Sequence, residues 1–239
     1  MDYKLYVNGL DEKMDQGIPE KHIILLAGTP GAMKSSFAYH FLEKNVKNND
    51  IKALYLTLEQ EKENFLYHLN KLGMGKDLGN NLQIFDMTTT REQWLKLSQN
   101  TTITEESARD LDTFKRQIET LRGALGFNLL VIDSLPVAEM MFKMKDPRED
   151  WFYFFKWLKK LQVTTILITE MSQDSPKYSK NDIDFLADGI IKLSMVEAAP
   201  TKTQRHIQLV KMRGVDHSTD PYVIYLKNGA FEASKALSI

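Results

Sequence analysis

The residues with the clearest chemical potential form the segment 28–35, which reads GTPGAMKS. A phosphate-binding loop of the Walker A type has glycine at its first and sixth positions, followed by lysine and then serine or threonine. The first glycine, the lysine and the serine are in place, whereas the sixth position holds Met33. The segment therefore predicts a phosphate-binding P-loop with one departure from the usual pattern.

The residues on either side of this loop support the interpretation. An apolar run at residues 23–27 predicts a buried strand before the loop, and residues 37–42 carry apolar side chains at helical spacing after it. A helix that begins at the loop points backbone N–H groups at an anion, while Lys34 reaches the outer phosphates and Ser35 reaches a magnesium ion. The weaker alternative is a chance glycine turn before a helix.

We predict that the whole loop contacts a bound nucleotide, with Mg²⁺ as its metal ion. The nucleotide-binding residues predicted from the motif are Gly28, Thr29, Pro30, Gly31, Ala32, Met33, Lys34, Ser35 and Ser36. Glycine in place of Met33 would let the backbone approach the phosphates without a Cβ, so methionine is expected to strain or reshape the loop. Pro30 lacks an N–H donor, although a rigid turn is compatible with its position.

Two carboxylates at predicted strand ends are candidates for the chemistry of the site. Asp133 follows the apolar run at 129–132, and we expect it to hold magnesium with Ser35, through water or by orienting that hydroxyl. A turn or cap residue is the alternative for Asp133. Glu59 ends the predicted strand at 53–58 and could polarise the water that attacks the γ-phosphate. The alternative for Glu59 is an exposed residue at the start of a charged helix.

Composition limits the class of protein. The chain has 239 residues, 43% hydrophobic and 26% charged, with a formal net charge of -1, which is typical of a globular protein with no overall attraction to nucleic acid. The absence of cysteine excludes disulfides, thiolate metal sites and a cysteine nucleophile. No apolar run approaches the ~20 residues of a membrane span, and residues 1–10 lack a signal-peptide core, so we expect a cytoplasmic protein without a membrane partner.

Strand and helix signals alternate through the first two thirds of the chain, which favours an α/β fold. The predicted strands are 23–27, 53–58, 82–85, 129–132 and 164–169, and the predicted helices are 61–72, 151–161 and a charged stretch at 90–125 that is broken near 100–104. Strands without intervening helices follow at 190–196, 206–212 and 222–226, and Asn228-Gly229 predicts a hairpin turn. We expect one domain over residues 1–239, with a mainly parallel central sheet and a C-terminal antiparallel meander.

Several further segments occur in one order along nearly the whole chain. They are GLD at 9–11, GIPE at 17–20, YLTLEQ at 55–60, VIDS at 131–134, ITE at 168–170, FLADG at 185–189, and KMRG at 211–214 with His217. Together with the phosphate-binding loop, they resemble the KaiC-like branch of the RecA superfamily of ATPases. The resemblance implies a RecA-like P-loop NTPase core that assembles with itself into a ring or filament, most often a hexamer, with ATP at the subunit interfaces.

The resemblance also implies roles for individual residues. Glu59 would be the catalytic glutamate, and Lys211 and Arg213 would reach the γ-phosphate on the neighbouring subunit. His217 would lie near the same interface and belong to the nucleotide-binding residues. A basic residue supplied in trans is worth ~10³–10⁵ in rate, so hydrolysis would depend on assembly. Family members usually carry two acids where this chain has Glu59-Gln60, and this difference, together with Met33, predicts slow hydrolysis.

Three functional hypotheses follow. The leading one is an ATPase that hydrolyses ATP slowly and acts through homo-oligomerisation. It would have a regulatory or signalling role and could bind a protein partner. The second is an accessory ATPase of recombination or repair that binds DNA through two predicted pore loops, 136–150 and 171–184. Their basic and aromatic residues are Lys143, Lys145, Arg148, Lys177, Tyr178 and Lys180, although nearby acids dilute the charge and favour ordinary solvated loops. The third is an ATP-sensing scaffold that does not hydrolyse ATP, motivated by Met33 and Gln60.

Overall fold

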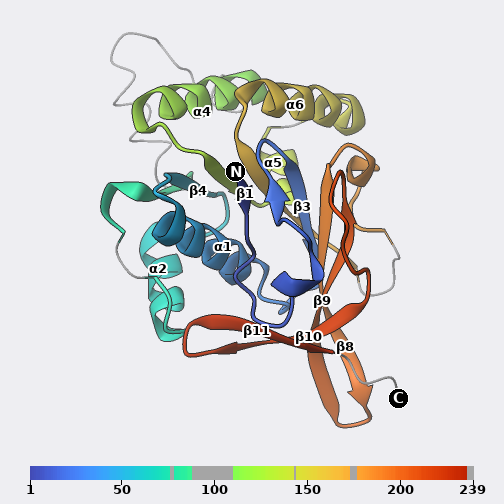
Figure 1. Ribbon diagram of the computed structural model, residues 1–239. Coiled ribbons are helices and arrows are strands. Elements are labelled where there is room, and N and C mark those ends of the chain that lie inside the picture. The colour runs from blue at the N-terminus through green and yellow to red at the C-terminus, as the bar shows by residue number, and fades with distance from the viewer. Residues whose placement is uncertain (76–77, 88–109, 143, 173–176, 236–239) are drawn as a thin grey trace.

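A nine-stranded sheet with the order β11-β10-β9-β8-β3-β7-β6-β4-β5 organises the computed structural model (Figure 1). The structure describes residues 1–239 except 76–77, 88–109, 143, 173–176 and 236–239. The strands are β3 (Ile23–Gly28), β4 (Ala53–Thr57), β5 (Leu82–Asp86), β6 (Leu129–Asp133), β7 (Thr164–Glu170), β8 (Gly189–Ala199), β9 (Lys202–Met212), β10 (Pro221–Lys227) and β11 (Ala230–Lys235). Strands β5, β4, β6, β7, β3 and β8 run parallel, and β9, β10 and β11 continue the sheet in antiparallel fashion. The predicted α/β fold with a C-terminal meander is confirmed.

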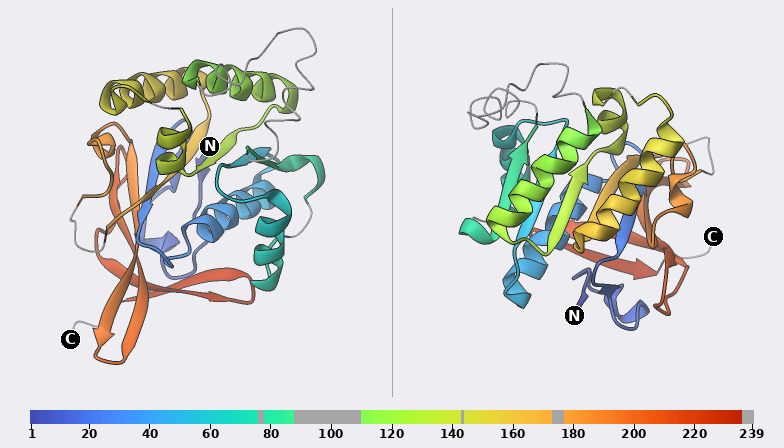
Figure 2. Two further views of the ribbon diagram at one scale, coloured as in Figure 1. Left: turned by 180° about the vertical axis from the view of Figure 1, so that it is seen from behind. Right: turned by 90° about the horizontal axis from the view of Figure 1, so that it is seen from above.

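Helices cover both faces of this sheet, as the two views of Figure 2 show. The helices are α1 (Lys34–Asn49), α2 (Lys62–Lys71), α4 (Leu111–Leu125), α5 (Leu135–Met141) and α6 (Pro147–Leu161), with short 3-10 helices η1 (Asp11–Lys13), η2 (Gly79–Asn81) and η4 (Ile183–Phe185). Side chains alternate between the faces along β3: Ile24 and Leu26 pack with α1 and α2, whereas Ile23 and Leu25 pack with α4, α5 and α6. A strand buried on both faces explains the continuous apolar run of β3.

The C-terminal hairpin turns where the sequence predicts it. Asn228 and Gly229 connect β10 to β11 with positive φ angles of 50° and 75°, as a type I′ turn requires. A Cβ added to Gly229 would lie 2.1 Å from the carbonyl oxygen of Gly73, so the turn also packs closely against the end of the α2 segment. The hairpin thereby closes one end of the core that contains α1.

One predicted loop is wrong. Residues 136–150 were expected to form a loop, but they contain most of α5 and the first turn of α6. Pro147 occupies the first turn of α6, and the Asp146 carboxylate accepts the N–H of Glu149 at 3.1 Å as an N-cap. Proline and a capping aspartate are the ordinary signals of a helix start, and they outweigh the loop character of the charged residues around them.

The predicted helical stretch 90–125 is described only in part. Residues 88–109 lie outside the described residues, and the remainder forms α4. Asp110 caps this helix by accepting the N–H of Thr113 at 3.0 Å, and Gly126 ends it with a φ of 69°. In the part of the chain that the structure describes, every helix is too short or too polar to span a membrane.

The N-terminal segment packs against α1. A short two-stranded sheet, β1 (Asp2–Tyr3) with β2 (Ile18–Pro19), frames this segment, and Leu5 and Val7 are fully buried. The His40 ring on α1 is also fully buried, with its Nε2 3.0 Å from the carbonyl oxygen of Tyr6. Because that oxygen can only accept, His40 donates through Nε2 and is neutral, which fixes the segment to the helix through one hydrogen bond.

We predict that His40 makes stability fall in mild acid. Burial, and to a smaller extent the nearby Lys44, lowers the pKa of His40 to about 4. The unfolded chain takes up this proton near pH ~6.5, so the free energy of unfolding falls as pH drops from there towards the folded pKa, by about 2 kcal/mol at pH 5. His40→Gln keeps a donor for Tyr6 and should flatten the dependence of urea unfolding on pH between 7 and 5 by that amount. The exposed His68→Gln serves as the control, and an equal flattening in both variants would contradict the assignment.

Candidate nucleotide-binding site

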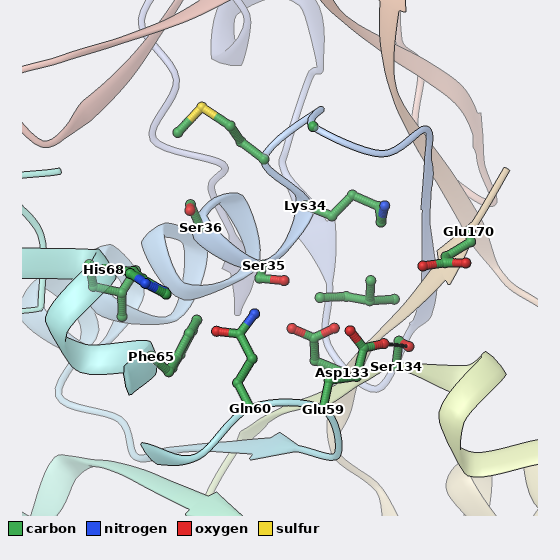
Figure 3. A pocket seen from close by; sticks show the side chains of 14 residues that line it. Lys34, Ser35, Ser36, Glu59, Gln60, Phe65, His68, Asp133, Ser134 and Glu170 are labelled. Atoms are coloured by element: carbon green, nitrogen blue, oxygen red, sulfur yellow. Dashed lines mark hydrogen bonds between the residues drawn. The ribbon is translucent and has the colours of Figure 1, made fainter. Parts of the chain in front are cut away.

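The predicted loop lies at the carboxyl edge of the parallel strands, between the end of β3 and the start of α1. Gly28, the last residue of β3, pairs with Glu170 on β7 and with Leu193 on β8. A cavity of about 300 Å³ opens beside the loop (Figure 3). It is lined by Gly31, Met33, Lys34, Ser35, Ser36, Glu59, Gln60, Phe65, His68, Leu69, Asp133, Ser134, Ile168 and Glu170. Ligands of open α/β sheets bind outside the carboxyl ends of the strands, and this cavity has that position.

The base of the loop is fixed to β8 and β9. A Cβ added to Gly28 would lie 2.4 Å from the carbonyl oxygen of Leu193, so only glycine fits at that position. Thr29 donates its N–H to Leu193 at 3.2 Å, and its hydroxyl accepts the N–H of Met195 at 3.0 Å. Arg205 on β9 donates from Nε to the carbonyl oxygen of Gly31 at 3.0 Å. These contacts hold the predicted residues Gly28 and Thr29 in supporting positions rather than in the cavity wall, and the cavity is also not lined by Pro30 or Ala32.

Met33 adopts the backbone conformation that the usual glycine would provide. Its φ and ψ are 66° and 34°, in the left-handed region, and α1 begins at the next residue. The half-buried side chain packs against the core cluster around α1. Met33 therefore keeps the loop in a left-handed turn. It does so at the conformational cost that any residue with a Cβ incurs in that region.

The amino end of α1 is open to an anion. No side chain caps this helix, and its first turn contains no acidic residue. Asp110 caps α4 and Asp146 caps α6, whereas α2 and α5, like α1, have no capping hydrogen bond from the N-cap side chain. The first N–H groups of a helix have no partner within it and carry a partial positive charge, so an uncapped end beside a cavity suits a phosphate group.

Lys34 bends back over the loop. Its Nζ donates to the carbonyl oxygens of Gly28 at 3.1 Å and Thr29 at 3.3 Å. Burial lowers the pKa of Lys34, and the negative charges of Glu170, Asp133 and Glu59 only partly offset that effect. A partly buried ammonium group that has carbonyl oxygens as its nearest partners would gain from an anion in the cavity. The residues present therefore fit a nucleotide phosphate.

Asp133 and Ser35 lie together on the floor of the cavity, as Figure 3 shows. The Asp133 carboxylate accepts a hydrogen bond from the Tyr55 hydroxyl at 2.6 Å, and the hydroxyl of Ser35 lies beside it. Burial raises the pKa of Asp133 even though Tyr55 and Ser35 act to lower it. Among the described residues, no group of three acidic or histidine side chains could hold a metal ion alone. Ser35 and Asp133 could hold Mg²⁺ together with phosphate and water oxygens, which is the usual arrangement for this ion.

Glu59 faces the same cavity from the end of β4. Its carboxylate accepts a short hydrogen bond from the hydroxyl of Ser134, the residue after β6. Gln60 also lines the cavity, and its backbone N–H donates to the hydroxyl of Thr57 at 3.1 Å. Glu59 is exposed and lies shortly before α2, as the alternative interpretation expects, but its carboxylate is also tied to the end of the neighbouring strand β6 through Ser134.

Several residues of the site were assigned no role from the sequence. Among them are Tyr55, Ser134 and Glu170. Glu170 ends β7, and the negative charge of its side chain raises the pKa of Lys34 more than that of Asp133 or Glu59 does. The rule that residues after parallel strands share one edge could have identified Ser134 and Glu170. A buried tyrosine hydroxyl needs a partner, which could have identified Tyr55.

Lys211, Arg213 and His217 lie away from this cavity. Lys211 pairs with Ile190 at the start of β8, whereas the loop is level with Leu193, so the strand alone separates them by roughly 10 Å. Lys211 donates to the carbonyl oxygens of Asp184, at 3.2 Å, and Ala187, at 2.7 Å. His217 forms a bridge with Met14 in the N-terminal segment. All three residues lie outside the lining of the cavity on their own chain.

Two basic residues of the predicted pore loops are paired with an acidic side chain. Arg148 and Lys177 both pair with Asp182, at 3.7 Å each. Lys143 lies outside the described residues. Among the described contacts, none favours nucleic acid as a ligand.

Comparison with known proteins gives a consistent picture. The family model "ATPase: KaiC" matches residues 3–233. A UPF0273 protein of Pyrococcus horikoshii is 24% identical over 99% of this chain and 98% of its own length, and a UPF0273 protein of Methanocaldococcus jannaschii is 25% identical over 90% and 88%. The circadian clock protein KaiC3 of Synechocystis is 24% identical over 93% of this chain, which spans 44% of that protein. A solved structure of a KaiC-like protein from Pyrococcus horikoshii superposes with a TM-score of 0.79 at 24% identity, covering 98% of this chain and 99% of that one.

The left-handed backbone at position 33 predicts that glycine is more stable than alanine there, the reverse of their order inside a helix. Met33→Gly and Met33→Ala both remove the thioether, but only alanine keeps a Cβ in the left-handed region. We expect glycine to be more stable than alanine here by roughly 1 kcal/mol in urea unfolding. The control pair is Lys156→Gly and Lys156→Ala within α6, where alanine should be more stable by about 1 kcal/mol. The same order at both positions would refute the prediction.

Proposed function

Because the chain belongs to the KaiC family of ATPases, we propose that it binds ATP with Mg²⁺ in the cavity beside residues 28–35 and hydrolyses it slowly between copies of itself. In this proposal residues 1–239 act as one RecA-like domain in a ring or filament, most simply a hexamer. The output is regulatory or signalling, exerted through assembly or through a protein partner. The observation that carries the proposal is the uncapped amino end of α1 beside Lys34.

ATP binding rests on the loop and on the helix that follows it. The phosphates would be bound by Lys34 and by the open N–H groups at the start of α1. On binding, Lys34 would exchange its hydrogen bonds to the carbonyl oxygens of Gly28 and Thr29 for stronger ones to phosphate. Ser36 and Gly31 would complete the wall on this side of the cavity.

Hydrolysis would use the acids on the opposite wall. Ser35 and Asp133 would hold Mg²⁺, which supplies electrostatic stabilisation of the charge on the transferred phosphoryl group. Glu59 would orient the attacking water and accept its proton, and the hydrogen bond from Ser134 sets the direction of the Glu59 carboxylate. The hydrogen bond from Tyr55 keeps Asp133 directed at Ser35.

Assembly would complete the site. Lys211 and Arg213 lie at the amino edge of the parallel strands, so on their own chain they are remote from the cavity. A neighbouring copy that places this edge against the cavity would bring both cations to the γ-phosphate, with His217 near the same junction. Slow turnover is expected because Met33 holds a strained conformation and Gln60 replaces a second acid.

Two substitutions separate binding from turnover. Lys34→Ala should abolish ATP binding in calorimetry, because the cation for the outer phosphates is lost. Arg213→Ala should leave the ATP affinity unchanged and lower phosphate release from the assembled protein by on the order of 10³, or to the assay background. Light scattering with and without ATP on the same samples reports assembly. Unchanged ATP affinity in Lys34→Ala would overturn the proposal.

Replacement of Glu59 tests whether the protein hydrolyses the bound nucleotide. Glu59→Gln should retain ATP binding and assembly while phosphate release falls to the background, since the proton acceptor is removed. Gln60→Glu, which restores the second acid, is the matched gain-of-function control and should raise the rate. If wild type and Glu59→Gln both release no phosphate, the protein is instead a scaffold that senses ATP without hydrolysing it.

A further inference from the structure

Asp188 is a buried carboxylate at the amino edge of the sheet, immediately before β8. It is 5% exposed and accepts hydrogen bonds from three directions. The backbone N–H of Ile23, at the start of β3, donates at 2.9 Å, and the ammonium group of Lys159 on α6 donates through a short contact. Nη1 of Arg213 donates at 3.3 Å. One side chain therefore joins the central strand, a covering helix and the predicted trans-acting arginine.

The main chain strengthens the same connection. The N–H of Arg213 donates to the carbonyl oxygen of Asp188 at 2.9 Å, and the N–H of Asp188 donates to Ile23 at 2.8 Å. Nη2 of Arg213 donates to the carbonyl oxygen of Phe185 at 3.3 Å. Lys211 is tied to the carbonyl oxygens of Asp184 and Ala187 in the same turn. The turn at residues 184–188 and the segment at residues 211–213 are thus one unit.

The charges in this unit keep the carboxylate ionised. Burial alone would raise the pKa of Asp188, but the hydrogen bonds from Lys159 and Ile23, with the positive charge of Lys159, outweigh burial and lower that pKa. Its ion pair with Arg213 therefore persists at neutral pH. The Arg213 side chain is 54% exposed, and among the described contacts it donates once from Nη1, to Asp188, and once from Nη2, to Phe185. A guanidinium has five N–H donors in a rigid plane, so three donors remain for another acceptor, and the two bonds already made restrict their orientation.

We propose that Asp188 is a positioning residue for Arg213, holding one part of the guanidinium so that its remaining donors meet the phosphate of the neighbouring copy. The inference rests on the proposed function, because it assumes that Arg213 acts in trans. Asp188 touches neither nucleotide nor reacting atoms. Its loss should therefore lower turnover at the neighbour's site and leave ATP binding on its own chain unchanged.

A mixing experiment tests this division of labour. Asp188→Asn retains an ATP site but misplaces the arginine, whereas Lys34→Ala lacks an ATP site and retains the arginine. Each protein alone should release phosphate at least tenfold more slowly than wild type. When equal amounts are mixed and allowed to exchange subunits, about one interface in four joins the intact halves if the copies associate head to tail, so about a quarter of the wild-type rate should return. A general folding defect in Asp188→Asn would give no such recovery.

Three controls interpret the mixture. Arg213→Ala mixed with Lys34→Ala should recover to the same degree. Asp133 and Lys34 belong to the same ATP site. A mixture of Asp133→Asn with Lys34→Ala therefore contains no subunit with an intact site and should not recover. Lys160→Met removes the exposed lysine next to Lys159 on the same helix and should remain near the wild-type rate. Should Asp188→Asn fail to fold by circular dichroism, Asp188→Glu keeps the charge, shifts the carboxylate by one methylene and takes its place in the same mixture.

The outcomes separate the two proposals. If Arg213→Ala recovers in the mixture and the folded Asp188 variant does not, Asp188 is a structural clasp and the positioning role is wrong. Wild-type turnover of the Asp188 variant alone would also overturn that role. If the Arg213→Ala mixture itself fails to recover, action in trans is wrong and the proposed function fails first. Recovery in both mixtures, with no recovery for Asp133→Asn, supports both.

Discussion

The parallel pairing of β3 between β7 and β8 is the constraint on which the site depends. It sets Gly28 opposite Glu170 on one side and Leu193 on the other, with so little room that a Cβ on Gly28 would meet the Leu193 carbonyl at 2.4 Å. The same pairing aligns the carboxyl ends of the neighbouring strands, so Glu59, Asp133 and Glu170 reach one cavity from three different strands. None of these acids is near Lys34 in sequence. Their proximity follows from strand order and register alone.

Much of this could be predicted from local sequence. Apolar runs located the strands, because a strand covered on both faces must be apolar at consecutive positions. The loop motif located the amino end of α1, and residues at predicted strand ends located Asp133 and Glu59. The prediction for residues 136–150 was wrong because it took a pore loop from the resemblance to RecA-like rings, whereas the local helix-start signals at Asp146 and Pro147 indicate a helix.

Other features depend on tertiary contacts that no local pattern encodes. The partner of the Tyr55 hydroxyl is Asp133, 78 positions away in the chain. In the sequence, Asp188 is only one residue of the FLADG segment. Its three donors come from the start of β3, from α6 and from the end of β9. Met33 shows the opposite case. The residue type departs from the motif, yet the backbone adopts the left-handed conformation that glycine enters most easily. A sequence pattern records side chains, whereas the loop geometry belongs to the backbone.

The separation between the two edges of the sheet has a consequence for stoichiometry. The cavity lies at the carboxyl edge, and the Asp188–Arg213 unit lies at the amino edge. Under the proposed arrangement each copy is at once a donor and an acceptor, so the assembly has a direction. An open row of copies would leave one cavity at its end without a cation, and only closure of the row would complete every site. Turnover per subunit would then measure ring closure itself.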